Sequence, residues 1–268
     1  MPQAPALWRN RDYMLLWSGQ VASTLGTTSS NVVVPLLILA LTGSAEAAGF
    51  AAALRFFPYL VFSLPVGALI DRWDRKAVMI RADVGRALAV ASIPVAMLFD
   101  ALTVWQIYVV ALVEGSLFVF FNIAEVAALP RVVAPEQLPQ ASAQNEAAFG
   151  IANILGPSLG TSLYQVFGRA VPFVGNAVTY AVSIVSLVSI KVPFRSEPAA
   201  APRSLREDVT EGLAWMWRNR LIRFMALLTG GINVMNASLP LIVIVLAQLA
   251  IMLPVAWLHG VVLGVATV

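Results

Sequence analysis

The stretch GALIDRWDRK, residues 67–76, decides the fold, because it sets a cluster of charged side chains between two long apolar runs. Each charge at the centre of a bilayer costs roughly 2.5–3.5 kcal/mol on insertion scales, so this cluster must lie in water. The apolar runs on either side are long enough to cross a bilayer as helices. We therefore predict that residues 67–76 form a short loop between two spanning helices.

Composition extends this reading to the whole chain. Hydrophobic residues make up 59% of the sequence and charged residues only 12%, whereas soluble domains carry about a quarter charged residues. Each span needs about 20 apolar residues, and the alternating pattern of membrane strands is missing. We predict an all-α polytopic membrane protein that has the lipid bilayer as its main partner.

Several kinds of chemistry are disfavoured by the same composition. The chain has no cysteine and a single histidine, His259, so no metal site and no cofactor are predicted. Neither Lys76 nor Lys191 lies in a phosphate-binding Gly-x4-Gly-Lys-Ser/Thr loop, which leaves ATP-driven transport unsupported. No nucleophile and base are paired in the loops, so an enzyme is not predicted. The basic residues lie between apolar runs instead of on one soluble face, which argues against a nucleic-acid partner.

Six spanning helices are predicted before the composition changes. They cover about residues 13–41, 47–70, 76–99 and 105–131, then a fifth helix after the loop at 135–139 that ends near 167, and a sixth at 170–190. We assign residues 1–192 to this six-helix bundle. Residues 193–221 form a basic linker whose amphipathic helix begins near Ser204. Residues 222–268 hold a seventh spanning helix and a further apolar segment.

The distribution of Lys and Arg predicts the orientation. The basic residues of one side lie in the N-terminus, in the 72–76 loop, at Arg131 and in the 191–223 region. The opposite loops carry essentially only Arg169. Basic loops stay on the cytoplasmic side. We expect a multi-pass protein of the plasma (inner) membrane with a cytoplasmic N-terminus.

A polar band interrupts the first apolar run at residues 26–31. Gln20, Thr24, Thr27 and Asn31 recur at helical spacing and share one face. Polar residues at mid-membrane face either protein or a wet cavity. This face therefore lines a pathway, or its Ser and Thr residues hydrogen-bond neighbouring helices; the sequence leaves both readings open.

The loop at 67–76 also matches a family motif. It resembles the loop between helices two and three of the major facilitator superfamily, Gly-x-Leu-x-Asp-Arg-x-Gly-Arg-Lys, with Asp74 in place of the second glycine and with matches at Gly67, Leu69, Asp71, Arg72, Arg75 and Lys76. The resemblance implies that these residues form half of a cytoplasmic gate that closes against a second six-helix half.

A second match lies in the fifth predicted helix. Gly150, Gly156, Pro157 and Gly160 resemble the glycine–proline motif of the family's antiporters, although Thr161 stands where another glycine is usual. Small residues allow close helix packing and Pro157 can bend the helix, so plain packing is the alternative. Segments 129–132 and 211–215 resemble the drug-exporter branch that includes macrolide and siderophore efflux proteins.

The chain also departs from the family pattern. Ala111 lies where the family's helix-four arginine would fall, and Thr27 replaces an acidic residue of helix one. The resemblance covers about residues 8 to 245, which is one half plus one or two helices. We therefore expect a truncated or frame-disrupted exporter that would need self-association or a second half-transporter as its partner.

Arg55 and Glu114 are the candidate coupling pair. Each lies eight to ten residues into a helix that enters from the outer side, so their depths agree within a few ångströms. The pair could bind and release a proton or cation, or it could be a static structural pair. Nearby cavity-lining candidates are Phe118, Asn122, Glu146 and Asn153, whereas Arg81, Asp83, Arg86 and Glu125 are expected to form a cytoplasmic cluster beneath the loop motif.

The functional expectation is a secondary active transporter. It would export a small amphipathic substrate by alternating access, coupled to a proton or cation gradient. The alternative is a membrane fragment without transport activity of its own.

Overall fold

The computed structural model describes residues 6–194, 205–232 and 235. These residues form helices and no strands, which confirms the all-α prediction. The chain divides into two compact units between Leu205 and Arg206. The elements are η1 Leu7–Arg9, α1 Arg11–Thr42, α2 Ala45–Ile70, α3 Arg75–Leu98, α4 Val104–Val132, η2 Pro135–Gln137, α5 Leu138–Phe167, α6 Val171–Ser189 and α7 Leu205–Arg218.

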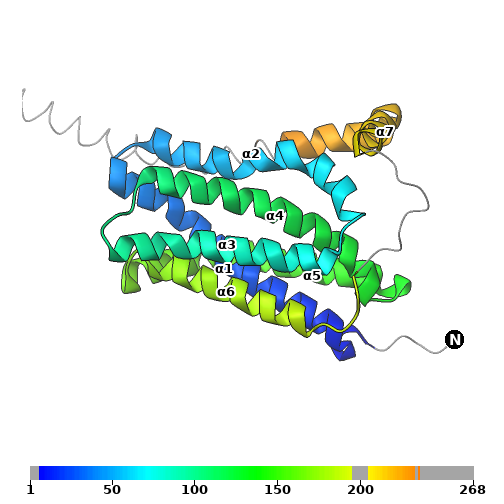
Figure 1. Cartoon of the computed structure of the whole chain (residues 1–268), viewed down its shortest axis with the longest axis horizontal. Helices are drawn as coiled ribbons and strands as arrows, with labels where there is room; N and C mark the ends of the chain where they lie inside the picture. The colour runs from blue at the N-terminus through cyan, green and yellow to red at the C-terminus, as the bar shows by residue number, and fades with distance from the viewer. Residues whose placement is uncertain (1–5, 195–204, 233–234, 236–268) are drawn as a thin grey trace, which may run out of the picture. The chain divides into compact units, whose positions relative to one another are not determined.

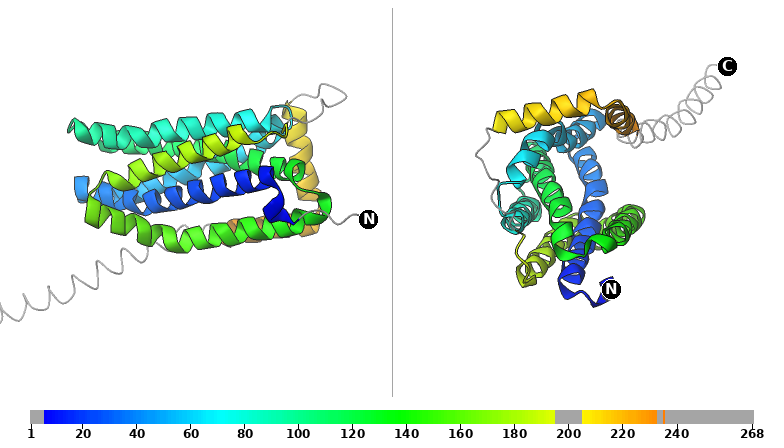
Figure 2. Two further views of the ribbon diagram at one scale, coloured as in Figure 1. Left: turned by 90° about the horizontal axis from the view of Figure 1, so that it is seen from below. Right: turned by 90° about the vertical axis from the view of Figure 1, so that its right-hand side faces the viewer.

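The first unit is a bundle of six long helices that run alongside one another (Figures 1 and 2). Their ends lie within two residues of the predicted spans. α1, α2, α4 and α6 are long and apolar enough to cross a membrane. α3 and α5 are similar in length and pack among them, with α3 against α4 and α6 and α5 against α1. The chain is a multi-pass membrane protein.

Short polar side chains fix where the helices begin. Ser44 Oγ accepts from the backbone N–H of Ala47 at 3.1 Å, and Asn10 Oδ1 accepts from that of Tyr13 at 3.1 Å. Such N-caps satisfy amide groups that have no partner within the helix. Gly43 ends α1 with φ at 68°, in the left-handed region that favours glycine. The loop between α1 and α2 is therefore only two residues long.

α1 continues without a break through the polar band at 26–31. Its hydroxyls bond back to the preceding turn: Thr28 Oγ1 donates to Thr24 O at 2.8 Å and Ser29 Oγ to Leu25 O at 2.7 Å. These bonds satisfy the hydroxyl donors within an apolar environment. The band therefore belongs to a continuous spanning helix.

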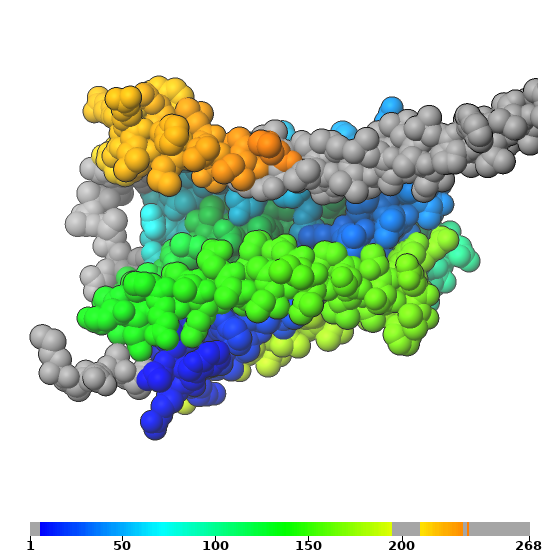
Figure 3. Space-filling view, turned by 180° about the vertical axis from the view of Figure 1, so that it is seen from behind, coloured from blue at the N-terminus to red at the C-terminus, as the bar shows by residue number. Residues whose placement is uncertain are grey.

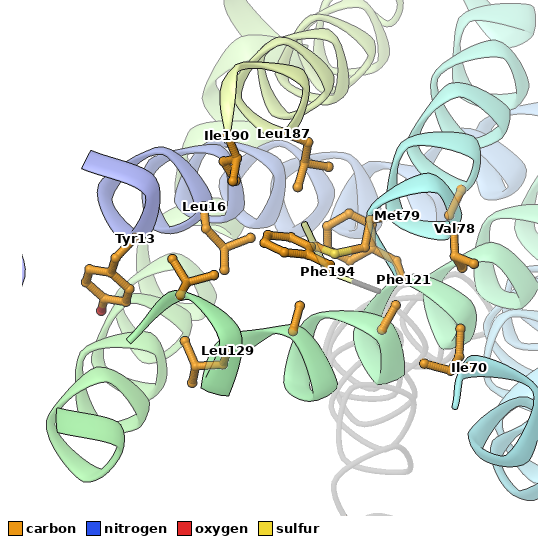
Figure 4. Close-up of a cluster of buried hydrophobic side chains, with 14 of the residues drawn as sticks. Tyr13, Leu16, Ile70, Val78, Met79, Phe121, Leu129, Leu187, Ile190 and Phe194 are labelled. Atoms are coloured by element: carbon orange, nitrogen blue, oxygen red, sulfur yellow. The ribbon is translucent and has the colours of Figure 1, made fainter. Parts of the chain in front are cut away.

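Two apolar clusters form the core of the bundle. One gathers residues from one end of each helix, among them Leu16, Ile70, Met79, Phe121 and Leu187 (Figure 4). The other gathers residues from the opposite ends, among them Val33, Ala51, Ile93, Ile107 and Phe173. Between the two clusters lie buried polar or charged residues of α1, α3, α4 and α6, among them Thr27, Arg86, Glu114 and Ser183, and the partly buried Arg55 of α2. A polar layer thus lies at mid-depth.

Small residues bring α1 close to its neighbours. A Cβ at Gly26 would overlap the side chain of Thr179 on α6, and one at Gly19 would lie 3.1 Å from Ser186 Cβ. α5 lies along α1 on another side, as the space-filling view shows (Figure 3). α1 is therefore the helix on which α5 and α6 are both assembled.

The second unit is described over residues 206–232 and at 235. α7 ends at Arg218, and residues 220–232 are helical again. Asn219 separates the two helices, because its Oδ1 accepts from the backbone N–H of Leu221 at 3.2 Å. Ser204, the rest of the expected seventh span, the eighth segment and His259 lie outside the described residues.

Candidate functional site

Glu114 and Arg55 meet in the polar layer. Glu114 is the eleventh residue of α4 and Arg55 the eleventh of α2, which is why the sequence places them at one depth. Arg55 Nη1 lies 3.0 Å from Glu114 Oε2, and the two side chains are 17% and 4% exposed. Arg55 also donates to Asn31 Oδ1 on α1. A carboxylate and a guanidinium this far from water stabilise each other only as a pair.

The helix backbones approach each other beside this pair. A Cβ added at Gly115 would overlap the backbone carbonyl of Arg55. Any larger residue at position 115 would push α2 away from α4. Gly115 therefore permits the short reach from Arg55 to Glu114, a role that the sequence pattern did not single out.

A hydrogen-bond chain leads from Glu114 to α6, α1 and α3. Tyr180 Oη lies 2.6 Å from Glu114 Oε1 and 2.9 Å from Thr27 Oγ1. Arg86 Nη2 donates to Thr27 Oγ1 at 3.2 Å. All four side chains are buried. Five of the six bundle helices thus meet in one polar network.

Arg86 lies elsewhere than expected. It is the twelfth of the 24 residues of α3 and 2% exposed, so it belongs to the mid-depth layer and not to a cluster beneath the loop motif. Its guanidinium pairs with Asp83 at 3.2 Å and lies over the rings of Tyr180, Phe118 and Phe121 at 4.3, 5.3 and 5.7 Å. Arg81, by contrast, is exposed. Sequence spacing predicted the residue and missed its depth.

Tyr180 was missed altogether. Asn176, Tyr180 and Ser183 are the buried polar residues of α6, at spacings of four and three. That spacing puts them on one face of an otherwise apolar helix, which is the signal that could have found them. Asn176 Nδ2 donates to Ser30 Oγ at 2.7 Å.

The polar face of α1 is divided between two environments. Thr27 is buried in the network just described, and Ala152 O of α5 lies 3.0 Å from Thr28 Oγ1 as a second acceptor for its one hydroxyl proton. The hydrogen bonds between helices that the sequence suggested are therefore present, and Thr27 does not line an open surface. Gln20, Thr24 and Asn31 are partly exposed.

The remaining cavity-lining candidates come from two separate helices. On α4, Asn122 Oδ1 accepts from Tyr59 Oη of α2 at 3.1 Å, and the ring of Phe118 lies 6.0 Å from that of Tyr59. On α5, Glu146 and Asn153 are exposed. α2 packs chiefly on α4, whereas α5 packs chiefly on α1. The two sets of residues therefore lie on helices that α1 connects.

The loop motif makes its described contacts within the bundle. Arg75 Nη2 lies 3.6 Å from Asp71 Oδ1, and Arg75 Nη1 donates to Ala127 O of α4 at 3.0 Å. Lys76 Nζ donates to Ile190 O at 2.7 Å, next to the end of α6. Leu69 and Gly67 are partly buried in the last turns of α2, while Arg72 and Asp71 are exposed.

Asp74 has a structural role at the position where the family motif has glycine. Its Oδ1 accepts from the backbone N–H groups of Lys76 at 2.9 Å and Ala77 at 3.2 Å, which makes it the N-cap of α3. Aspartate and glycine are both favourable N-cap residues. The departure from the motif therefore preserves the start of α3.

The second motif splits into packed and open positions. A Cβ at Gly156 would overlap Thr28 of α1, and one at Gly160 would overlap the backbone carbonyl of Ser29. Gly150 has open space around it. Pro157 lies within the continuous helix α5. Two of the three glycines therefore hold α5 against α1.

Among the described residues, no group of three His, Asp or Glu side chains could hold a metal.

Comparison with known proteins supplies the family. The model of the Major Facilitator Superfamily matches residues 16–268. Macrolide efflux protein A of Streptococcus pyogenes is 27% identical over 242 residues, which cover 88% of this chain and 59% of that protein. Its namesake from Enterococcus faecalis is 28% identical over 70% of this chain and 60% of the relative. Multidrug efflux pump Tap of Mycobacterium tuberculosis is 26% identical over 82% of this chain and 54% of that protein. The chain thus spans between half and two thirds of the length of these relatives.

Proposed function

The chain belongs to the Major Facilitator Superfamily, and from that premise we propose that it acts as a secondary active transporter. The transporter exports a small amphipathic compound from the cytoplasm by alternating access. Relatives named for macrolide and multidrug efflux support this direction and substrate class. The observation that carries the proposal is the buried pair of Arg55 and Glu114 at mid-depth, because an ionisable group within the membrane is costly without a function.

Glu114 is the proposed coupling carboxylate. With Glu114 ionised, Arg55, Arg86, Glu114 and Asp83 sum to zero charge; a proton on Glu114 leaves a net charge of +1 in the polar layer. Burying an unpaired cation is unfavourable. Protonation therefore favours an arrangement in which Arg55 reaches water or another anion, and proton binding selects one of two conformations.

The substrate path runs along α1 between α5 and the α2–α4 pair. On this proposal the partly exposed Gln20, Thr24 and Asn31 of α1 line the path together with Phe118 and Asn122 of α4 and Glu146 and Asn153 of α5. An amphipathic compound needs such a mixture of aromatic and polar groups. Small-residue contacts at Gly156 and Gly160 let α5 slide against α1.

The loop motif is the proposed cytoplasmic gate. Arg75 is tied to α4 and Lys76 to the end of α6, so the loop is fixed to this half. Asp71 pairs with Arg75 at 3.6 Å but its side chain is 75% exposed, so it is accessible to a second half. The basic residues in and beside this loop support a cytoplasmic position for it.

The test is transport by the purified chain in proteoliposomes with an imposed pH gradient. A radiolabelled macrolide is the probe. Gradient-driven flux is expected in the wild type, and Glu114→Gln should reduce it to the flux measured without a gradient. Glu46→Gln, an exposed position in the first turn of α2, is the matched control and should retain the wild-type flux.

Two results would contradict the proposal. Unchanged pH dependence in Glu114→Gln would remove the coupling role from that residue. The absence of flux for every amphipathic probe, from protein that is folded in the liposomes, would favour the alternative of a membrane protein that does not transport on its own. Adding the remaining half of a relative then decides whether a partner restores flux.

A further inference from the structure

We propose that Arg86 is a positioning residue for Glu114, acting through Thr27 and Tyr180, and that Arg55 is the arginine that leaves when Glu114 is neutralised. The inference rests on the proposed function for the role of Glu114 in transport. The contacts that carry it are independent of transport. Neither Arg86 nor Tyr180 belongs to the two matched motifs, and Thr27 stands where the family pattern has an acidic residue.

Donor and acceptor chemistry gives the chain one direction. Arg86 can only donate, and an ionised Glu114 can only accept. The short 2.6 Å contact assigns the proton of Tyr180 to Glu114, so the oxygen of Tyr180 must accept from Thr27, 2.9 Å away. The oxygen of Thr27 in turn accepts from Arg86 at 3.2 Å. Every hydroxyl proton between the guanidinium and the carboxylate is thereby oriented.

The orientation favours the charged form of Glu114. Hydrogen bonds to an ionised group are stronger than those between neutral groups, and polarised chains strengthen each member. Tyr180 therefore offers Glu114 a donor that Arg86 and Thr27 have already aligned. Removing Thr27 or Arg86 weakens this donor without removing a direct contact of the carboxylate.

The two arginines are unequal partners. Arg86 is 2% exposed, has Asp83 at 3.2 Å and lies over three aromatic rings, so it keeps an anion and its packing when Glu114 takes a proton. Arg55 is 17% exposed, and its described partners are Glu114 and the neutral Asn31. When Glu114 loses its charge, Arg55 is the one of the two arginines that has no counter-charge.

These groups account for what surrounds Glu114 from each helix packed on it. α1 contributes Thr27 and Asn31, α2 contributes Arg55, α3 contributes Arg86 with Asp83, and α6 contributes Tyr180. Two of the three other charged groups in this network are therefore cations. Arg86 keeps its position and Arg55 can leave, so protonation of Glu114 has a defined structural consequence.

Infrared titration of the purified chain in lipid nanodiscs tests the inference. The C=O band of the protonated Glu114 carboxyl is assigned by its loss in Glu114→Gln and followed against pH. Tyr180→Phe should move its midpoint upward by about one to two pH units, since a hydrogen bond to a charged group is worth roughly that much. Thr27→Val should move it in the same direction by less, and Thr27→Ser should restore the wild-type midpoint.

Arg86 itself is tested with a neutral pair. Arg86→Gln alone leaves Asp83 buried without a counter-charge and endangers folding, so Asp83→Asn/Arg86→Gln removes both charges together. An upward midpoint shift is expected. Tyr108→Phe, whose hydroxyl bonds Ala47 O at 3.1 Å away from this network, is the matched control and should not shift.

The outcomes separate this inference from the proposed function. The positioning role would be overturned if Tyr180→Phe and the double variant both kept the wild-type midpoint in protein that elutes as one folded species. It would also be overturned if the Glu114 band were absent at every pH in all variants. A band that is absent in the wild type and appears in Tyr180→Phe supports the role. Shifted midpoints in a chain that moves no solute would count against transport and uphold the positioning of Glu114.

Discussion

At the scale of single residues, the polar layer shows how a few side chains give an apolar bundle a defined register. Hydrophobic contacts alone are non-directional and tolerate sliding. Glu114 contacts Tyr180 at 2.6 Å and Arg55 at 3.0 Å. These polar contacts do not tolerate sliding, because a buried group that loses its partner keeps its desolvation cost. The layer therefore fixes the relative heights of α2, α4 and α6.

Asp74 supports a prediction at this scale. Because it caps α3 through two backbone amides, Asp74→Ala should lower the free energy of unfolding by about 1 kcal/mol, and Asp74→Gly by only a few tenths. Thermal unfolding in detergent measures the difference. Equal losses for the two variants would show that the side chain acts through its charge and not as a cap.

At the scale of elements, the sequence determines helices better than it determines contacts. Charge clusters and apolar runs placed helix ends within two residues, since a bilayer leaves little choice of span length. Sequence spacing brought Arg55 and Glu114 together for the same reason. It misplaced Arg86 and missed Tyr180, because which face of a helix meets which neighbour depends on packing that a single helix does not encode.

The contact between α1 and α5 gives the prediction at this scale. A Cβ at Gly160 would overlap the backbone carbonyl of Ser29, which cannot move aside as a side chain can. Gly160→Ala should therefore separate the two helices and lower the unfolding temperature. Gly150→Ala, in open space on the same helix, should be neutral or stabilising by up to about 1 kcal/mol through helix propensity.

This comparison separates packing from propensity, because both variants add one methyl group to α5. Distance measurements between spin labels on α1 and α5 report the separation directly. A Gly160→Ala protein with unchanged stability and unchanged distances would show that α5 does not depend on close approach to α1, and the sliding contact proposed for transport would lose its basis.

At the scale of the whole molecule, six antiparallel spans return the chain to the side on which it starts. Arg72, Arg75, Lys76 and Arg131 lie in or beside the loops at 71–74 and 133–137, whereas the loops at the opposite end, 43–44, 99–103 and 168–170, carry only Arg169. From the positive-inside bias we expect the first set of loops, and with it the N-terminus, on the cytoplasmic side.

The chain contains no cysteine, so single introduced thiols report this orientation without background. Ala101→Cys and Glu136→Cys both lie at exposed positions, in loops on opposite sides. A membrane-impermeant maleimide added to intact cells should label Ala101→Cys and should reach Glu136→Cys only after the membrane is opened. The reverse pattern would invert the assignment, and with it the direction in which Asp71 faces and the sense in which protonation of Glu114 could be coupled to export.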